Sequence, residues 1–197
     1  MSTHYKINEV FYSMQGEGLY TGTPALFIRF AGCNLKCDFC DTNFETKLRI
    51  EKTAFIDWLD QKVSQKDIWN IILTGGEPLL QDIDLILDYF SEEYLGIQLH
   101  IETNGTKEHN GLDQYHTTVS PKFPDFKLRS GEQLKLVYTG QEDLTPYIEN
   151  TEFSFYYLQP CWKDGKSNIV ETYNRVMKEQ RNGWRLSLQT HKILGIK

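Results

Sequence analysis

The amino-acid sequence predicts a single α/β domain built around a parallel sheet. Apolar and β-branched runs bounded by turn residues recur along the chain, and helix-period stretches separate several of them. At about 30 residues per strand-and-helix unit, the 197 residues allow about six units. A closed eight-fold barrel needs roughly 250 residues and does not fit. Because no repeat or linker interrupts the pattern, we expect one domain over residues 1–197.

The predicted strands are the apolar runs that begin or end at turn residues. Six of them lie at residues 25–30, 70–73, 98–102, 117–120, 133–137 and 153–159, and the pattern allows a seventh at 185–188.

The predicted helices show apolar residues at helical spacing. Residues 53–64 place Phe55, Leu59 and Val63 on one face, and residues 82–94 repeat the pattern. A third helix is expected at 167–180 and a short one at 142–149. Residues 104–132 are rich in Gly, Pro, Asn and charge and show no helical period. We therefore expect truncated helical crossovers in the second half of the sheet.

The charge balance disfavours a nucleic-acid partner. Lys and Arg number 21 against 27 Asp and Glu, for a net charge of -6, whereas binding to a phosphate backbone depends on basic side chains. No run approaches the roughly 18 apolar residues of a membrane helix, and the N-terminus lacks the apolar core of a secretion signal. We expect a cytoplasmic protein with no membrane partner that acts on a small molecule.

Three of the four cysteines, Cys33, Cys37 and Cys40, lie within eight residues directly after the first predicted strand. In a reducing compartment this crowding indicates metal binding or redox chemistry. Structural zinc needs four ligands, so Cys161, His4 or His191 would have to supply the fourth. The alternative is a [4Fe-4S] cluster held by three cysteines, with one iron open to a substrate or cofactor. The spacing alone leaves both alternatives open.

Glycine-rich and polar motifs follow three further strands. They are the Gly-Gly-Glu-Pro run at 75–78, Glu-Thr-Asn-Gly at 102–105 and Ser-Pro-Lys at 120–122. All lie at carboxyl ends of strands, where ligands bind in parallel α/β folds. The glycines would let backbone carbonyls approach an ammonium group, and Glu77 would add negative charge. Taken alone, the first motif also fits an ordinary turn ended by Pro78.

The C-x3-C-x-aromatic-C spacing and the Gly-Gly-Glu-Pro run together resemble the radical S-adenosylmethionine (SAM) superfamily. This resemblance implies an open partial (βα)6 TIM-like barrel and a [4Fe-4S] cluster on Cys33, Cys37 and Cys40. It also implies that the protein binds SAM. The residues implied to contact SAM are Phe39, Gly75, Gly76, Glu77, Asn104, Ser120, Pro121, Lys122 and Gln159.

Three further motifs indicate a particular family within this superfamily. The Gln-Gly-Glu-Gly run at 15–18, Cys-Asp-Thr at 40–42 and Gln-Thr-His-Lys at 189–192 are similar to the 7-carboxy-7-deazaguanine synthase family. This implies a carbon–nitrogen lyase of 7-deazapurine and queuosine biosynthesis. Such an enzyme contracts 6-carboxy-5,6,7,8-tetrahydropterin to 7-carboxy-7-deazaguanine and releases ammonia. The 5′-deoxyadenosyl radical takes hydrogen from C6 of the pterin and later returns it, so that SAM is reused.

The same resemblance implies the pterin-binding and magnesium-binding residues. The residues implied to contact the pterin are Met14, Gln15, Gly16, Arg29, Thr74, Glu102 and Gln189. Arg29 suits the substrate carboxylate because a guanidinium can bind it through two donors. The hydroxyl of Thr42 is implied to bind Mg2+, which prefers oxygen ligands. The resemblance further implies a homodimer and a flavodoxin-type reductant, while Cys161 is expected to be a free thiol.

Two rival functions follow from the same cysteines. An activase that installs a glycyl radical in a partner shares the cysteine motif, but is not expected to carry the runs at 15–18 and 189–192. A non-enzymatic iron or zinc protein would use the cysteines for structure or electron transfer. That second rival leaves the glycine and lysine motifs without a role.

Overall fold

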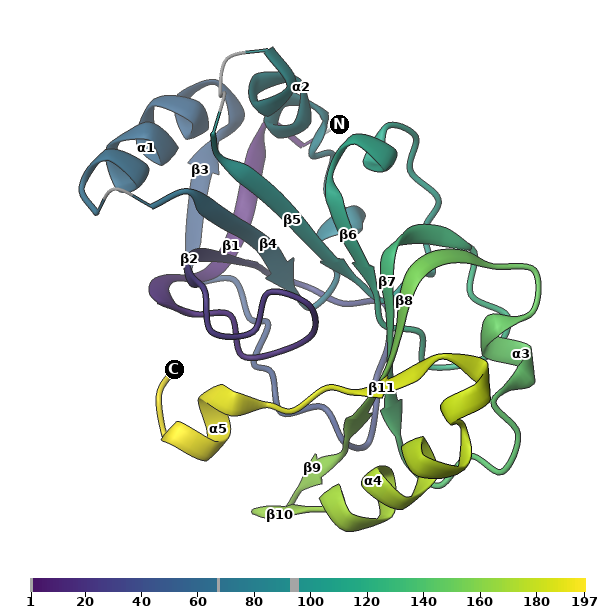
Figure 1. Ribbon diagram of the computed structural model, residues 1–197. Helices are drawn as coiled ribbons and strands as arrows, with labels where there is room; N and C mark the ends of the chain where they lie inside the picture. Colours follow the sequence, from purple (N-terminus) through teal and green to yellow (C-terminus); the bar gives the residue numbers. More distant parts are fainter. Residues whose placement is uncertain (1, 67, 93–95) are drawn as a thin grey trace.

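The computed structural model describes residues 2–66, 68–92 and 96–197. Across these ranges nine strands form one open sheet in the order β11-β8-β7-β6-β5-β4-β2-β1-β3, and β9 and β10 form a separate hairpin (Figure 1). The strands are β1 (His4–Met14), β2 (Pro24–Phe30), β3 (Leu48–Glu51), β4 (Asn70–Gly75), β5 (Gln98–Thr103), β6 (His116–Val119), β7 (Ser130–Tyr138), β8 (Glu152–Pro160), β9 (Trp162–Lys163), β10 (Lys166–Ser167) and β11 (Trp184–Leu186).

Seven strands of the large sheet run parallel to one another. These are β2, β4, β5, β6, β7, β8 and β11. They include all six predicted strands, and β11 is the seventh strand that the sequence allowed at 185–188. The α/β class and the open partial barrel are therefore confirmed.

The strands β1 and β3 extend the sheet at one edge and were not predicted. β1 pairs antiparallel with both β2 and β3. The residues of β1 do not alternate cleanly between buried and exposed, because the register shifts between Ile7 and Glu9. The period-2 pattern that marks a strand is therefore weak in this segment.

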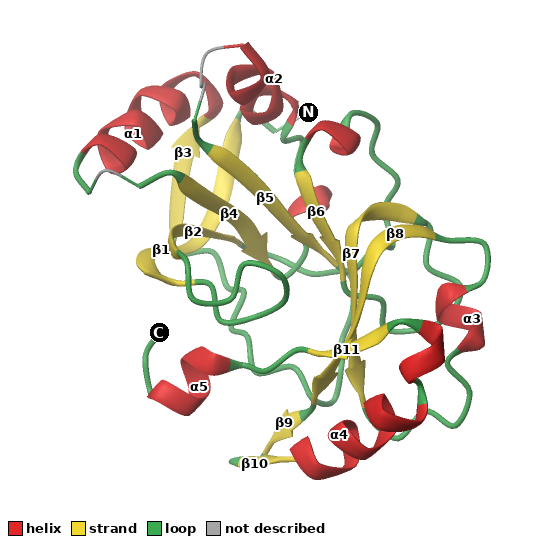
Figure 2. Ribbon diagram, viewed as in Figure 1, coloured by secondary structure: helices red, strands yellow, loops and turns green. Residues whose placement is uncertain are grey.

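The helices confirm the prediction of shortened crossovers. They are α1 (Lys52–Ser64), α2 (Asp84–Glu92), α3 (Thr145–Ile148), α4 (Ile169–Lys178) and α5 (Thr190–Leu194). Residues 93–94, the predicted end of the second helix, lie outside the described residues. Between β5 and β6 the chain forms only the 3-10 turn Leu112–Gln114, and between β7 and β8 only the four-residue α3. Figure 2 shows α1 and α2 beside one half of the sheet and α3 and α4 beside the other.

The two faces of the sheet differ in polarity where the second half curves. Along β7, the buried apolar residues Leu134 and Leu136 alternate with the buried polar residues Gln133 and Lys135. Leu134 and Leu136 belong to an apolar cluster with Leu158 and Trp184. The opposite face of β7 therefore buries polar side chains, which need partners inside the barrel.

Candidate active site

A cavity of about 460 Å³ opens at the carboxyl ends of the parallel strands. Arg29, Thr74, Glu102 and Gln159 line it from the ends of β2, β4, β5 and β8. Nearly all the expected site residues line this cavity: Met14, Gln15, Gly16, Arg29, Cys33, Cys37, Phe39, Cys40, Thr42, Thr74, Gly75, Gly76, Glu102, Asn104, Ser120, Lys122, Gln159 and Gln189. Glu77 and Pro121 are absent from its wall.

The three clustered cysteines lie on the loop that follows β2, and all three face this cavity as free thiols. The loop is fixed at both ends of the cluster. The backbone N–H of Cys40 donates to the carbonyl of Cys37 at 3.0 Å, and the N–H of Leu35 donates to Sγ of Cys33 at 3.4 Å. Asn104 donates to Oδ1 of Asn34 at 3.1 Å. The end of β5 therefore braces the cysteine loop.

The donor set of this loop suits a [4Fe-4S] cluster. Among the described residues no three His, Cys, Asp or Glu side chains are grouped to hold a single metal ion. A cluster instead takes each thiolate on a different iron, so its ligands need not converge on one point. Of the fourth ligands considered for zinc, His191 lines the cavity, whereas Cys161 and His4 do not.

Lys122 places a positive charge beside the thiols. Its ammonium group lies 5.8 Å from the centre of the Phe39 ring. Burial raises the pKa of Cys37, and the charge of Lys122 opposes that rise. Burial likewise lowers the pKa of Lys122, and Cys37 opposes that change. Lys122 therefore offsets part of the negative charge that thiolate ligands bring to the loop.

The glycines at 75–76 let the end of β4 pack against the cysteine loop. A Cβ atom on Gly76 would lie 2.1 Å from the carbonyl oxygen of Gly32 and 2.8 Å from Cβ of Cys33. Gly75 has φ +145, and a Cβ there would lie 2.3 Å from the carbonyl oxygen of Phe30. Close packing therefore requires both glycines, independently of the approach to an ammonium group that the sequence suggested.

Glu77 lies behind the cavity wall rather than on it. This side chain is fully buried. Its Oε1 accepts from the N–H of Leu79 at 3.0 Å and from Oγ1 of Thr103 at 2.8 Å, while Oε2 accepts from the N–H of Asn104 at 2.6 Å. Burial raises its pKa, and these hydrogen bonds oppose the rise. Glu77 therefore holds the 103–104 turn beneath the cavity and does not line the cavity itself.

Comparison with known proteins identifies the family. The family model of the Radical SAM superfamily matches residues 27–119. The chain is 41% identical to the 7-carboxy-7-deazaguanine synthase of Bacteroides thetaiotaomicron over 98% of both chains. It is 34% identical to that of Neisseria meningitidis serogroup B over 98% of this chain and 94% of the relative.

The chain belongs to the 7-carboxy-7-deazaguanine synthase family.

The fold agrees with this family. The crystal structure of QueE from Escherichia coli superposes with a TM-score of 0.69 at 24% identity, over 95% of each chain. Membership of the radical SAM superfamily implies a [4Fe-4S] cluster and SAM. No helix in the described ranges has the length and apolar character needed to cross a membrane.

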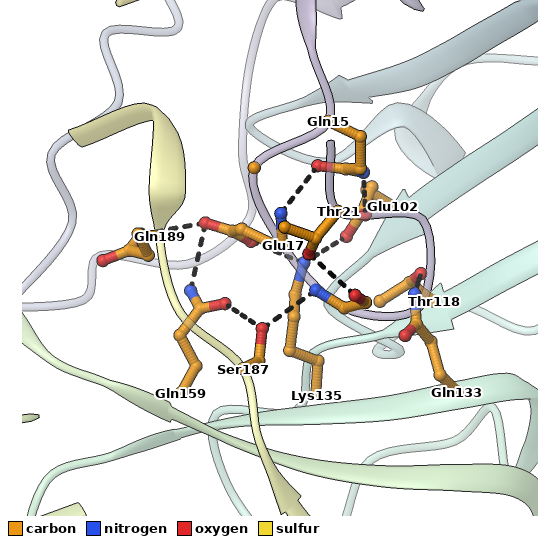
Figure 3. Close-up of polar contacts among 12 residues, drawn as sticks. Gln15, Glu17, Thr21, Glu102, Thr118, Gln133, Lys135, Gln159, Ser187 and Gln189 are labelled. Atoms are coloured by element: carbon orange, nitrogen blue, oxygen red, sulfur yellow. Dashed lines mark hydrogen bonds and ion pairs between the residues drawn. The ribbon is translucent and has the colours of Figure 1, made fainter. Parts of the chain in front are cut away.

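A buried charge cluster, absent from the sequence prediction, forms one wall of the cavity of this family member (Figure 3). Nζ of Lys135 lies 2.6 Å from Oε2 of Glu17 and 2.9 Å from Oε2 of Glu102. Burial alone would raise the pKa of Glu17, but Lys135 and a hydrogen bond from Gln189 lower it to about 2. Burial would lower the pKa of Lys135, but the two carboxylates raise it. Glu17 and Lys135 therefore stay charged at neutral pH.

The C-terminal segment lines part of the cavity with Gln189, His191 and Lys192. The backbone N–H of Thr190 donates to the carbonyl of Gly16 at 2.9 Å. A Cβ on Gly16 would lie 2.1 Å from Nδ1 of His191, so glycine is needed for this contact. Lys192 forms an ion pair with Asp41 of the cysteine loop. The tail thus links the first loop of the chain to the cysteine loop.

Arg29 lines the cavity but is already paired in the structure. Its Nε donates to Oε1 of Glu9 at 2.9 Å, and Glu9 also pairs with Lys197 at 2.6 Å. The guanidinium lies over the ring of Phe11, 5.7 Å from its centre. Glu9 engages Nε of Arg29, which leaves the two terminal nitrogens to bind a carboxylate through two donors.

Proposed function

We propose that the protein is a 7-carboxy-7-deazaguanine synthase that converts 6-carboxy-5,6,7,8-tetrahydropterin to 7-carboxy-7-deazaguanine and ammonia. One observation carries the proposal: the relatives that match over the full chain are named 7-carboxy-7-deazaguanine synthase. The geometry agrees with it, because the three cysteines open into the same cavity as a buried polar wall. The names of these relatives disfavour the glycyl-radical activase and the non-enzymatic metal protein.

The cysteine loop is proposed to hold the cluster. Cys33, Cys37 and Cys40 supply three thiolates, and one iron stays open for SAM. When bound, the cluster and SAM supply a one-electron step that produces a hydrogen-abstracting radical. The protein contributes position and a dry, enclosed site. The remaining SAM contacts are proposed for Phe39, Gly75, Gly76, Asn104, Ser120, Lys122 and Gln159, all on the cavity wall, with Glu77 and Pro121 supporting them from outside it.

The polar wall is proposed to bind the pterin. A carboxylate accepts two N–H donors, so Glu102 suits the amino-pyrimidinone edge, and the amides of Gln15 and Gln189 can donate or accept beside it. Arg29 suits the substrate carboxylate through the two terminal nitrogens that Glu9 does not engage. Met14, Gly16 and Thr74 complete the proposed pterin contacts.

The proposal also includes a magnesium ion, an electron donor and an oligomeric state. Thr42 lines the cavity beside the cysteine loop, where its hydroxyl can join substrate oxygens and water around Mg2+. A flavodoxin-type protein is proposed as electron donor, and a cytoplasmic homodimer as the working form.

Anaerobic reconstitution tests this function. The protein is loaded with iron and sulfide, reduced, and supplied with SAM, Mg2+ and 6-carboxytetrahydropterin, and the deazaguanine product and ammonia are measured. We expect both from the wild type, none from Cys37→Ala, and unchanged turnover from Cys161→Ala, because Cys161 does not line the cavity. Full turnover by Cys37→Ala would exclude the cluster assignment. Stable folding with zinc and no iron uptake would favour the non-enzymatic alternative.

A further inference from the structure

The cluster of Glu17, Lys135 and Glu102 brings two acids and one base together inside the barrel. Glu17 comes from the loop after β1, Glu102 from β5 and Lys135 from the middle of β7. The Lys135 side chain is only 5% exposed. An unpaired ammonium at this depth would be strongly disfavoured, and so would two facing carboxylates with no cation between them.

In each carboxylate of the cluster, one oxygen accepts from Lys135 and the other accepts from side-chain amides. Oε2 of Glu17 and Oε2 of Glu102 both accept from Lys135. Oε1 of Glu102 accepts from Nε2 of Gln15 at 3.2 Å. Oε1 of Glu17 accepts from Nε2 of Gln189 at 2.9 Å and of Gln159 at 3.2 Å. One ammonium group therefore holds the two carboxylates whose other oxygens orient three cavity-lining amides.

The charges of the cluster do not cancel. With both carboxyl groups ionised, two negative charges face one positive charge, which leaves one net negative charge in a buried wall. The other titratable groups nearby are Lys122, His116 and His191, and burial lowers the pKa of all three. A ligand edge rich in N–H donors is the natural partner of such a surface.

We propose that Lys135 is a positioning residue of this cavity: it ties down Oε2 of both acids, so that Oε1 of Glu102 and the oriented amides meet the donor edge of the ligand. This inference rests on the proposed pterin-binding function and adds a residue to it. Lys135 acts through Glu102, Glu17 and the glutamines, and its removal affects ligand binding more than the chemical step.

A charge-balance experiment separates this role from a simple packing role. Lys135→Met keeps most of the length of the side chain and removes the charge. It leaves two unbalanced carboxylates, and we expect KM for the pterin to rise about tenfold or more, with a smaller change in kcat. The double variant Lys135→Met with Glu17→Gln restores one net negative charge. We expect its KM to recover most of the way toward the wild-type value. The exposed Lys178→Met is the matched control.

The effect of Glu17→Gln on pterin binding, measured in the Lys135→Met background, decides the outcome. A double variant that binds the pterin better than Lys135→Met supports the proposal, and one that binds equally or less well overturns it. Should Lys135→Met fail to fold, recovery of folded protein on adding Glu17→Gln supports charge compensation, and continued failure overturns it. A wild-type enzyme that does not bind the pterin would refute the proposed function, whereas the unfolding temperatures of the variants would still test the charge balance.

Discussion

Replacement of Gly76 by alanine tests how the glycine motif supports the cysteine loop. The added Cβ would lie 2.1 Å from the carbonyl oxygen of Gly32, 2.6 Å from its carbonyl carbon and 2.8 Å from Cβ of Cys33. Real Cβ contacts essentially never fall below 3.0 Å. The backbone of the cysteine loop must therefore withdraw by about 1 Å, a displacement that typically costs on the order of a hundredfold in rate when it reaches a reacting group.

We expect Gly76→Ala to fold, because overpacking of this kind costs about 1–3 kcal/mol. The cluster should assemble poorly. The assay is anaerobic reconstitution followed by measurement of bound iron per chain and of the rate of reductive SAM cleavage. We expect a clear loss of iron and a cleavage rate on the order of a hundredfold lower.

Gly111→Ala is the control for backbone strain. Gly111 has φ +83, but a Cβ there meets no atom within 4 Å, and it precedes the 3-10 turn Leu112–Gln114 far along the chain. The substitution should cost about 1–2 kcal/mol through its left-handed backbone and leave iron content unchanged. Wild-type iron content and SAM cleavage in Gly76→Ala would refute the packing role assigned to Gly76.

Three further predictions concern single side chains of the site. Glu77→Gln should lower the free energy of unfolding by about 1–3 kcal/mol in urea denaturation, because an amide cannot accept all three hydrogen bonds at this buried position; an unchanged midpoint would contradict this. The pKa of Glu17 is lowered from 4.5 to about 2, so its stabilising effect is present above pH 4.5 and is lost as the pH falls towards 2. Wild-type stability should therefore fall more steeply than that of Glu17→Gln over this range, and parallel curves would argue against the ion pair. Thr42→Ala should raise the Mg2+ concentration needed for half-maximal turnover, measured after chelation and readdition, and an unchanged requirement would remove Thr42 from the proposed magnesium site.

The parallel half of the fold could be predicted because its strands are continuous apolar runs with turn residues at their ends. The strands that the sequence did not reveal have no such pattern. β3 (Leu48–Glu51) has no fully buried residue, and in β1 the register shift after Ile7 breaks the alternation. Both depend on pairing with distant segments, which local periodicity does not encode.

The cysteine loop and the strand-end motifs could be placed from sequence because each ligand-bearing segment follows a recognisable strand. The burial of Glu77 behind the wall was not foreseen, because a motif gives the residue type and not the direction of its side chain. Lys135 was missed although a signal was present: polar Gln133 and charged Lys135 alternate with leucines in a strand expected to be buried. Such a lysine needs a carboxylate partner, but only the fold shows that Glu17 and Glu102 supply it.

The most direct test of the central claim is a turnover count with limiting SAM. Reconstituted, reduced wild-type protein receives less SAM than pterin, and 7-carboxy-7-deazaguanine and remaining SAM are measured by mass spectrometry. If hydrogen returns to the cofactor after ring contraction, product should exceed the SAM supplied while SAM persists. SAM cleavage without any deazaguanine, or no reaction at all with a fully loaded cluster, would contradict the proposed function.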